Sequence, residues 1–204
     1  MADTTVDAGR IGPQLTLDDV ALPPAVGERL ATLFDHDGDI ETAGEWIAVE
    51  RAALVHDAGR MATIDDLCTT DDGAHVFSAR DGSHEQAYIC VLDPLIYPLL
   101  TDTPGTVRSE TPVRGETVEI GVSEDGASVS HDDVVVSIGV SDHVDAVDEV
   151  TPEVVYRQIC GYIHVFADET EYAEWAEDVE AATTALPVSE GVALAGELTS
   201  ELFE

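Results

Sequence analysis

Two cysteines and one aspartate are the residues of this sequence whose types and spacing could do chemistry. Cys90 and Asp93 lie three residues apart inside the apolar run 88–100. Cys160 lies inside a second apolar run, 159–167. Two thiolates make a soft metal site, and a neighbouring carboxyl can take protons from thiols and return one to a leaving group. The three residues therefore predict soft-metal chemistry coupled to proton transfer, provided that the fold brings them to one cavity.

Each of these residues also has a purely structural interpretation. Free cysteines are among the most buried residue types, so Cys90 and Cys160 could simply fill the core. Asp93 precedes Pro94, and an Asp-Pro pair is typical of the cap and first turn of a helix. The third cysteine, Cys68, lies on a predicted short helix and is interpreted as a core residue. The residue types alone leave both interpretations open.

The two apolar segments resemble those of a known family. Residues 88–98, Tyr-Ile-Cys-Val-Leu-Asp-Pro-Leu-Ile-Tyr-Pro, are similar to the Cys-x-x-Asp segment of the alkylmercury (organomercurial) lyases. Residues 159–167 resemble the second segment of that family, and residues 169–177, with Trp175, resemble the helix that follows it. The resemblance covers about residues 75–204.

This resemblance implies a reaction and a role for each residue. Cys90 and Cys160 match the mercury-binding thiols of the family, and Asp93 matches the carboxylate that shuttles protons and contacts the metal. The thiols would capture an organomercurial, and protonation of carbon would cleave the carbon–mercury bond to give a hydrocarbon and Hg(II). No organic cofactor is implied. The product Hg(II) would pass to low-molecular-weight thiols or to a mercuric reductase.

The sequence departs from the family pattern at several positions. Gly161 stands where members often have a second cysteine, and residues 108–111, Arg-Ser-Glu-Thr, lack a further cysteine of the family. The aromatic residue that precedes the first cysteine is displaced by one position, to Tyr88. Pro94 follows Asp93 and disfavours helical geometry for the residue before it, so the direction of the Asp93 side chain is expected to differ.

Two other classes of function remain open. A soft-metal binding protein, for mercury or copper, would use the same cysteines without turnover, and it would differ from a lyase in the role of Asp93. A small regulator would use a winged-helix-like N-terminal unit to bind DNA. The absence of a basic patch disfavours the regulator.

The charge of the chain is extreme. Its 204 residues include 43 acidic and eight basic residues, all eight of them Arg, for a net charge of −35, while 44% of residues are hydrophobic. The acids are spread over the whole chain, which argues against an acidic disordered tail. We interpret the charge as a halophilic adaptation, because concentrated salt screens self-repulsion while the acids keep the surface solvated. Nucleic acid is not an expected partner of this surface.

The sequence also bounds the location of the protein. No stretch reaches the roughly 20 apolar residues that span a bilayer, and the first ten residues lack the basic and apolar regions of a secretory signal. Three cysteines do not make a disulfide framework. We therefore expect a cytoplasmic monomer with reduced thiols that acts on a small molecule.

The pattern of apolar residues predicts an α+β fold in two parts. Residues 1–74 are expected to form a small helical, winged-helix-like region, and residues 75–204 a catalytic domain with a mostly antiparallel or mixed sheet packed with helices. Helices are predicted at 22–34, 42–58, 63–69, 152–158, 169–182 and 189–202. Strands are predicted at 75–79, 106–109, 117–122, 134–140 and 159–167, and the last of these would place Cys160, Tyr162, His164 and Phe166 on one face.

Three acidic stretches could be mistaken for metal sites. Residues 35–46 have acids at the first positions of a calcium loop, but position 12 is Trp46, where a bidentate Glu is required. His and Asp also cluster at residues 131–133 and 142–145. We interpret all three stretches as solvated surface.

Overall fold

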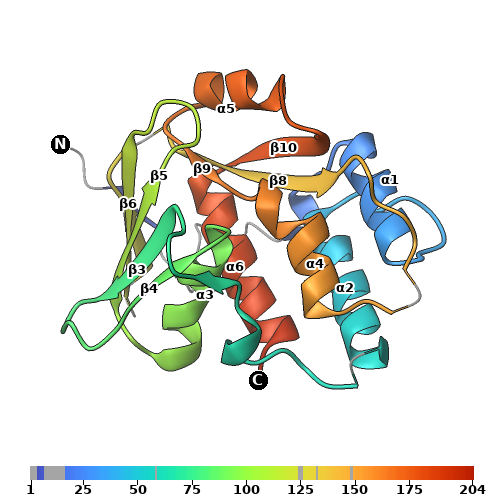
Figure 1. Ribbon diagram of the computed structural model, residues 1–204, viewed down its shortest axis with the longest axis horizontal. Helices are drawn as coiled ribbons and strands as arrows, with labels where there is room; N and C mark the ends of the chain where they lie inside the picture. Colours follow the sequence, from blue (N-terminus) through green and yellow to red (C-terminus); the bar gives the residue numbers. More distant parts are fainter. Residues whose placement is uncertain (1–3, 7–16, 58, 124–125, 132, 148) are drawn as a thin grey trace.

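Two antiparallel sheets and six α-helices make up the part of the chain that the computed structural model describes, residues 4–6, 17–57, 59–123, 126–131, 133–147 and 149–204 (Figure 1). The fold is therefore α+β, as predicted. The larger sheet has seven strands in the order β1-β7-β6-β5-β3-β4-β2. Their bounds are β1 Thr4–Val6, β2 Thr69–Thr70, β3 His75–Ala79, β4 Glu85–Tyr88, β5 Gly105–Glu110, β6 Thr117–Ser123 and β7 Gly126–Val129.

The smaller sheet is built around one fully buried strand. Its order is β10-β8-β9, with β8 at Val135–Ser141, β9 at Val165–Phe166 and β10 at Ala181–Pro187. All seven residues of β8 are buried, because helices α1, α5 and α6 and a 3₁₀ turn pack against it. This explains why β8 has only apolar or small residues, Val-Val-Ser-Ile-Gly-Val-Ser, rather than an alternation of apolar and charged ones.

Helix α6 lies at the centre of the molecule, between the two sheets (Figure 1). It packs against α2 and against α3, which covers the larger sheet, and also contacts β8 and β10 of the smaller one. Gly191 allows the close approach to β8, since a Cβ there would lie 2.9 Å from a methyl carbon of Val136. The helices are α1 Pro24–Leu33, α2 Ala43–Asp57, α3 Leu92–Thr101, α4 Pro152–Gln158, α5 Glu169–Ala176 and α6 Val188–Leu202, and the 3₁₀ turns are η1 Leu17–Asp19, η2 Ile64–Asp66 and η3 Cys160–Tyr162.

The N-terminal region does not confirm the winged-helix-like outline. The third predicted helix, at residues 63–69, is the 3₁₀ turn η2 followed by the short strand β2. This strand pairs with β4, so the region also contributes to the larger sheet. The division of the chain at residue 74 stays a prediction.

The strand predicted at residues 159–167 is wrong over most of its length. Cys160–Tyr162 form the turn η3, and only Val165–Phe166 are extended and paired, with β8. The hydroxyl of Ser137 on β8 donates to the carbonyl of Tyr162 (2.8 Å) and accepts from the N–H of His164 (2.9 Å). A side chain of the neighbouring strand therefore satisfies backbone groups that a longer strand would have paired.

The helix predicted at residues 169–182 is too long. Helix α5 ends at Ala176, and the chain then forms β10, which pairs with β8 along its whole length. Alanine favours helices, so the Ala-Ala-Thr-Thr-Ala sequence gave no strand signal; its pairing with β8 decides the conformation. The predicted strand at 75–79 and helix at 189–202 are confirmed.

None of the helices in the described ranges is long and apolar enough to cross a membrane.

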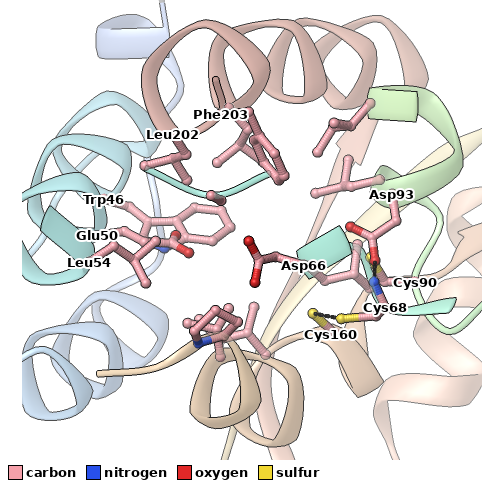
Figure 2. A pocket seen from close by; sticks show the side chains of 18 residues that line it. Trp46, Glu50, Leu54, Asp66, Cys68, Cys90, Asp93, Cys160, Leu202 and Phe203 are labelled. Atoms are coloured by element: carbon pink, nitrogen blue, oxygen red, sulfur yellow. Dashed lines mark hydrogen bonds between the residues drawn. The ribbon is translucent and has the colours of Figure 1, made fainter. Parts of the chain in front are cut away.

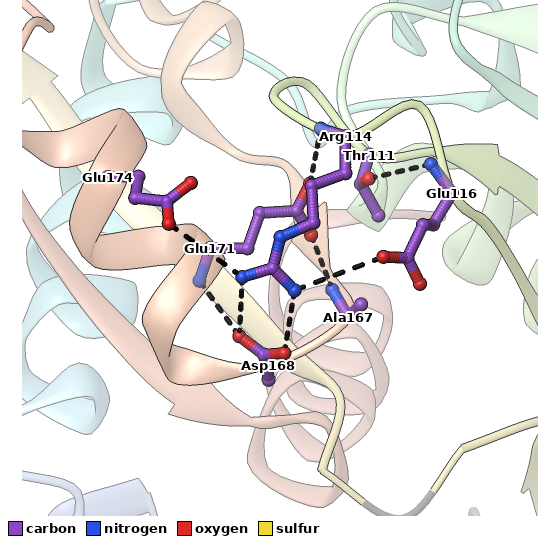
Figure 3. Close-up of polar contacts among 7 residues, drawn as sticks. All are labelled: Thr111, Arg114, Glu116, Ala167, Asp168, Glu171 and Glu174. Atoms are coloured by element: carbon purple, nitrogen blue, oxygen red, sulfur yellow. Dashed lines mark hydrogen bonds and ion pairs between the residues drawn. The ribbon is translucent and has the colours of Figure 1, made fainter.

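A buried carboxylate of helix α5 joins the two sheets (Figure 3). Glu171, which is fully buried, accepts the backbone N–H of Arg114 (2.8 Å) in the turn after β5 and that of Ala167 (2.9 Å) after β9. Burial raises the pKa of this carboxyl, but hydrogen bonds from Thr111, Ala167 and Arg114 outweigh burial, so the pKa lies below its ordinary value. The exposed Arg114–Asp168 ion pair (2.8 Å) lies beside it.

Replacing Glu171 should destabilise the fold. Glu171→Ala leaves two backbone N–H groups without their partner, so we expect a loss of about 3 kcal/mol in the free energy of unfolding, measured with urea. Because the pKa of the Glu171 carboxyl is lowered, the wild type should be more stable than the variant above pH ~4.5. This difference in the free energy of unfolding should disappear as the pH falls below that value.

Glu174→Ala is the matched control. Glu174 belongs to the same cluster but is exposed and lies 4.0 Å from Arg114. Its loss should change the stability by less than about 0.5 kcal/mol. An equal loss in both variants would show that Glu171 contributes only surface charge.

Candidate active site

All three cysteines of the chain and Asp93 line a single cavity (Figure 2). The sulfur atoms of Cys68 and Cys160 lie 3.6 Å apart, and the Cys160 thiol also interacts with the Cys90 thiol. The Asp93 carboxyl contacts both Cys68 and Cys90. The structure thus brings together the three residues that sequence analysis singled out, together with a fourth.

Two main-chain hydrogen bonds flank Cys90 and hold the cysteine segments together. The N–H of Ile89 donates to the carbonyl of Cys68 (3.0 Å), and the N–H of Val91 donates to the carbonyl of Ile163 (3.2 Å), just after η3. The segment between β4 and α3 is therefore bonded on one side to the Cys68 segment and on the other to the Cys160 segment.

The Asp-Pro interpretation predicted that Asp93 caps a helix, and this prediction is wrong. Helix α3 begins at Leu92, so Asp93 is its second residue, and Pro94 is accepted because the first turn needs no N–H at that position. The Asp93 carboxylate accepts the backbone N–H of Cys68 at 2.8 Å. Burial raises the pKa of Asp93 to about 6, although these hydrogen bonds oppose the shift.

The thiols are held in their protonated form. Interactions with the Cys68 and Cys90 thiols, and then burial, raise the pKa of Cys160 well above its ordinary value. For Cys90, the interaction with Cys160 lowers the pKa, but burial and the neighbouring Asp93 carboxyl outweigh it and the pKa is raised. Metal binding therefore requires a nearby group that takes the thiol protons, and Asp93 is in contact.

A chain of hydrogen bonds supports the turn that carries Cys160. The imidazole of His164 contacts the Gly161 carbonyl through Nε2 (3.0 Å) and Nε2 of His75 through Nδ1 (3.4 Å), while Nδ1 of His75 contacts the hydroxyl of Ser109 (2.9 Å). Burial lowers the pKa of His75 to about 3 and also lowers the pKa of His164, so both rings are neutral. Since the carbonyl can only accept, each ring carries its proton on Nε2, and the Ser109 hydroxyl donates to His75.

The cavity has a volume of about 90 Å³ and is mostly apolar. The thiols and Asp93 form one side, and Trp46, Glu50 and Leu54 of α2 form the opposite side (Figure 2). Residues of α6 and the segment after it, among them Leu202 and Phe203, also line it. Asp66 lines it too, but its carboxyl is paired with Arg60 (2.7 Å), which lowers its pKa to about 2.

Glu50 is a second functional candidate that sequence analysis missed. It is only 5% exposed, and its Oε2 atom has no hydrogen-bond partner among the described residues. Burial raises the pKa of Glu50 to about 7, while the neighbouring Trp46 acts in the opposite direction. Its spacing of four residues from both Trp46 and Leu54 was the available signal, because it puts the carboxyl on the apolar face of the helix.

Cys68 was also missed as a site residue. It packs against the hydrophobic core, as interpreted, but its sulfur also lies 3.6 Å from that of Cys160 and its backbone N–H donates to the Asp93 carboxylate. No local pattern marked it, since the pairing of β2 with β4 brings it to the cavity.

The other acidic stretches make no metal site within the described residues. No group of three or more His, Cys, Asp or Glu side chains there is arranged to hold a metal ion. Asp142 instead pairs with Arg29 at 2.7 Å. Asp132, in the first His/Asp cluster, lies outside the described residues. The same result means that the cysteines must rotate to surround a metal.

The buried Glu50 carboxyl should make stability depend on pH. Because its folded-state pKa of about 7 exceeds the ordinary 4.5, the folded state binds the proton more tightly, and stability falls as the pH rises from about 4.5 to about 7. Glu50→Gln removes this loss. Relative to wild type, the variant should gain on the order of 3 kcal/mol between pH 4.5 and pH 8.5, measured by urea unfolding.

Glu28→Gln on α1 is the control, since it makes the same charge change at an exposed position. It measures the part of the effect that comes from net charge alone. If the two variants respond equally to pH, Glu50 is not the source of the dependence.

Two comparisons with known proteins found matches to this chain. A family model described as "MerB: Alkylmercury lyase" matches residues 69–200. A solved structure titled "Crystal structure of the mercury-bound form of MerB2" is similar at 16% sequence identity with a TM-score of 0.47, over 63% of this chain and 59% of that one. The match thus spans less than two thirds of that protein. No curated protein matches the chain.

Proposed function

The chain belongs to the alkylmercury lyase family, and on that premise we propose that it cleaves the carbon–mercury bond of organomercurials by protonolysis, with Cys90, Cys160 and Asp93 as the reacting groups. The observation that carries the proposal is that these three side chains line one small, mostly apolar cavity. Soft thiolates favour mercury over the hard cations of the cell.

The reaction balances with the protons of the two thiols. One thiol displaces the carrier thiol from R–Hg–SL, so that an S–Hg bond forms and LSH leaves with the proton. The second thiol gives its proton to the Asp93 carboxylate and its sulfur binds mercury. Asp93 then delivers this proton to carbon, the C–Hg bond breaks, and R–H leaves while Hg(II) stays on two sulfurs. Mercury remains Hg(II) throughout.

The environment of the carboxyl suits this double role. With a pKa of about 6, Asp93 is ionised at neutral pH and can accept a proton, yet it is acidic enough when protonated to return it. The mostly apolar walls of the cavity favour proton transfer to carbon.

The size of the cavity favours small organic groups. Its volume of about 90 Å³ is smaller than the ~150 Å³ of a cavity that binds benzene. We infer that methylmercury fits without rearrangement of the walls, whereas a phenyl group requires them to move.

Further features complete the proposal. External low-molecular-weight thiols or a mercuric reductase would remove Hg(II) by thiol exchange, in the service of mercury detoxification. The protein would work as a cytoplasmic monomer, with its acidic surface adapted to concentrated salt.

Asp93→Asn distinguishes a lyase from a soft-metal binding protein. The amide cannot relay the proton, so we expect mercury binding to persist while methane release from methylmercury falls about 10²-fold or more. Headspace gas analysis in high salt with excess thiol measures the release.

The control variant, Asp66→Asn, makes the same change in the same cavity and should retain methane release within a few-fold. Wild-type turnover by Asp93→Asn would remove the carboxyl from the mechanism, and no methane from wild type would favour the binding protein.

The thiols should be needed for both steps. We expect Cys90→Ser and Cys160→Ser each to lose methane release and also the retention of mercury through gel filtration, because a hydroxyl is a poor ligand for a soft metal. Full retention of mercury by either variant would exclude that cysteine as a ligand.

A further inference from the structure

Cys68 lies where a third sulfur could reach the same metal atom. Its sulfur is 3.6 Å from that of Cys160, its side chain contacts Asp93, and it lines the cavity. Cys68 packs against the hydrophobic core, but unlike a cysteine that only fills the core it also has a thiol and a carboxylate beside it. It also precedes residues 69–200, the part of the chain that the family model matches.

We propose that Cys68 is a third mercury-binding thiol, which joins Cys90 and Cys160 on Hg(II) after the carbon–mercury bond has been cleaved. The source of the Hg(II) rests on the proposed function, but the binding of Hg(II) by three sulfurs does not.

The proton of Cys68 has a defined destination. After protonolysis, Asp93 has delivered its proton to carbon and is again a carboxylate. The S–H bond of Cys68 then breaks, its proton moves to Asp93, and its sulfur forms a third S–Hg bond. The total charge is unchanged, because the negative charge moves from the carboxylate to the three-sulfur mercury complex, and nothing is oxidised or reduced.

The required movement is a rotation of side chains. The described residues hold no ready-made metal position, and sulfurs 3.6 Å apart must separate slightly to admit a metal between them. Rotation about the Cα–Cβ bonds suffices, since hydrogen bonds to Ile89 and Val91 already hold the three backbone segments together.

The test counts the sulfurs around Hg(II). One equivalent of mercuric chloride is added to the reduced full-length protein without added thiol, and the coordination number is measured by X-ray absorption. We expect three sulfurs in wild type and two in Cys68→Ser. The variant should also hold Hg(II) at least about tenfold less tightly against a competing dithiol, the size of effect that follows the loss of a supporting group at a metal site.

Met61→Leu is the matched control, because it removes a sulfur that does not line the cavity. It should keep three sulfurs and wild-type retention. Two sulfurs in wild type would overturn the proposal whether or not Cys68→Ser folds, and so would equal retention of Hg(II) by a folded Cys68→Ser.

Methane release from methylmercury is measured separately. Three sulfurs without methane would refute the lyase but keep the third thiol, and methane with a two-sulfur product would refute the third thiol alone.

Discussion

The chemistry of the cavity depends on the pair of backbone hydrogen bonds on either side of Cys90. One joins Ile89 to Cys68, and the other joins Val91 to Ile163. They fix three segments that are far apart in the sequence, since Cys68 and Cys160 are separated by 92 positions. With the backbone fixed, the sulfurs stay near one another, and only side-chain rotation is needed to bring them around a metal atom.

Around these sulfurs, one small cavity holds three carboxyl groups in three different states. The Arg60 partner keeps Asp66 ionised, burial brings Asp93 to a pKa of about 6, and burial brings the pKa of Glu50 to about 7. When neighbouring carboxyl groups have different pKa values, they can take different roles, some structural and some in proton transfer. Only Asp93 touches the thiols, and it is therefore the one that can exchange their protons.

The sequence was most informative where the signal is local. Cys90 and Asp93 lie three residues apart, and the long amphipathic helix α6 is visible from its spacing of apolar residues. What could not be predicted depends on pairing over long distances. Strand β10 is set by its partner β8, the turn at Cys160 by the hydroxyl of Ser137, and the place of Cys68 by the pairing of β2 with β4. A propensity or a period carries no information about such partners.

The raised pKa of the Cys90 and Cys160 thiols has a consequence for the chemical resilience of the protein. Peroxides and alkylating agents attack thiolates, and two buried sulfurs whose pKa is raised offer little thiolate to attack. In the proposed reaction, a soft metal bonds to sulfur as the proton leaves for Asp93, so no preformed thiolate is needed. The same desolvation that makes the pair unreactive toward ordinary electrophiles would thus still permit mercury binding.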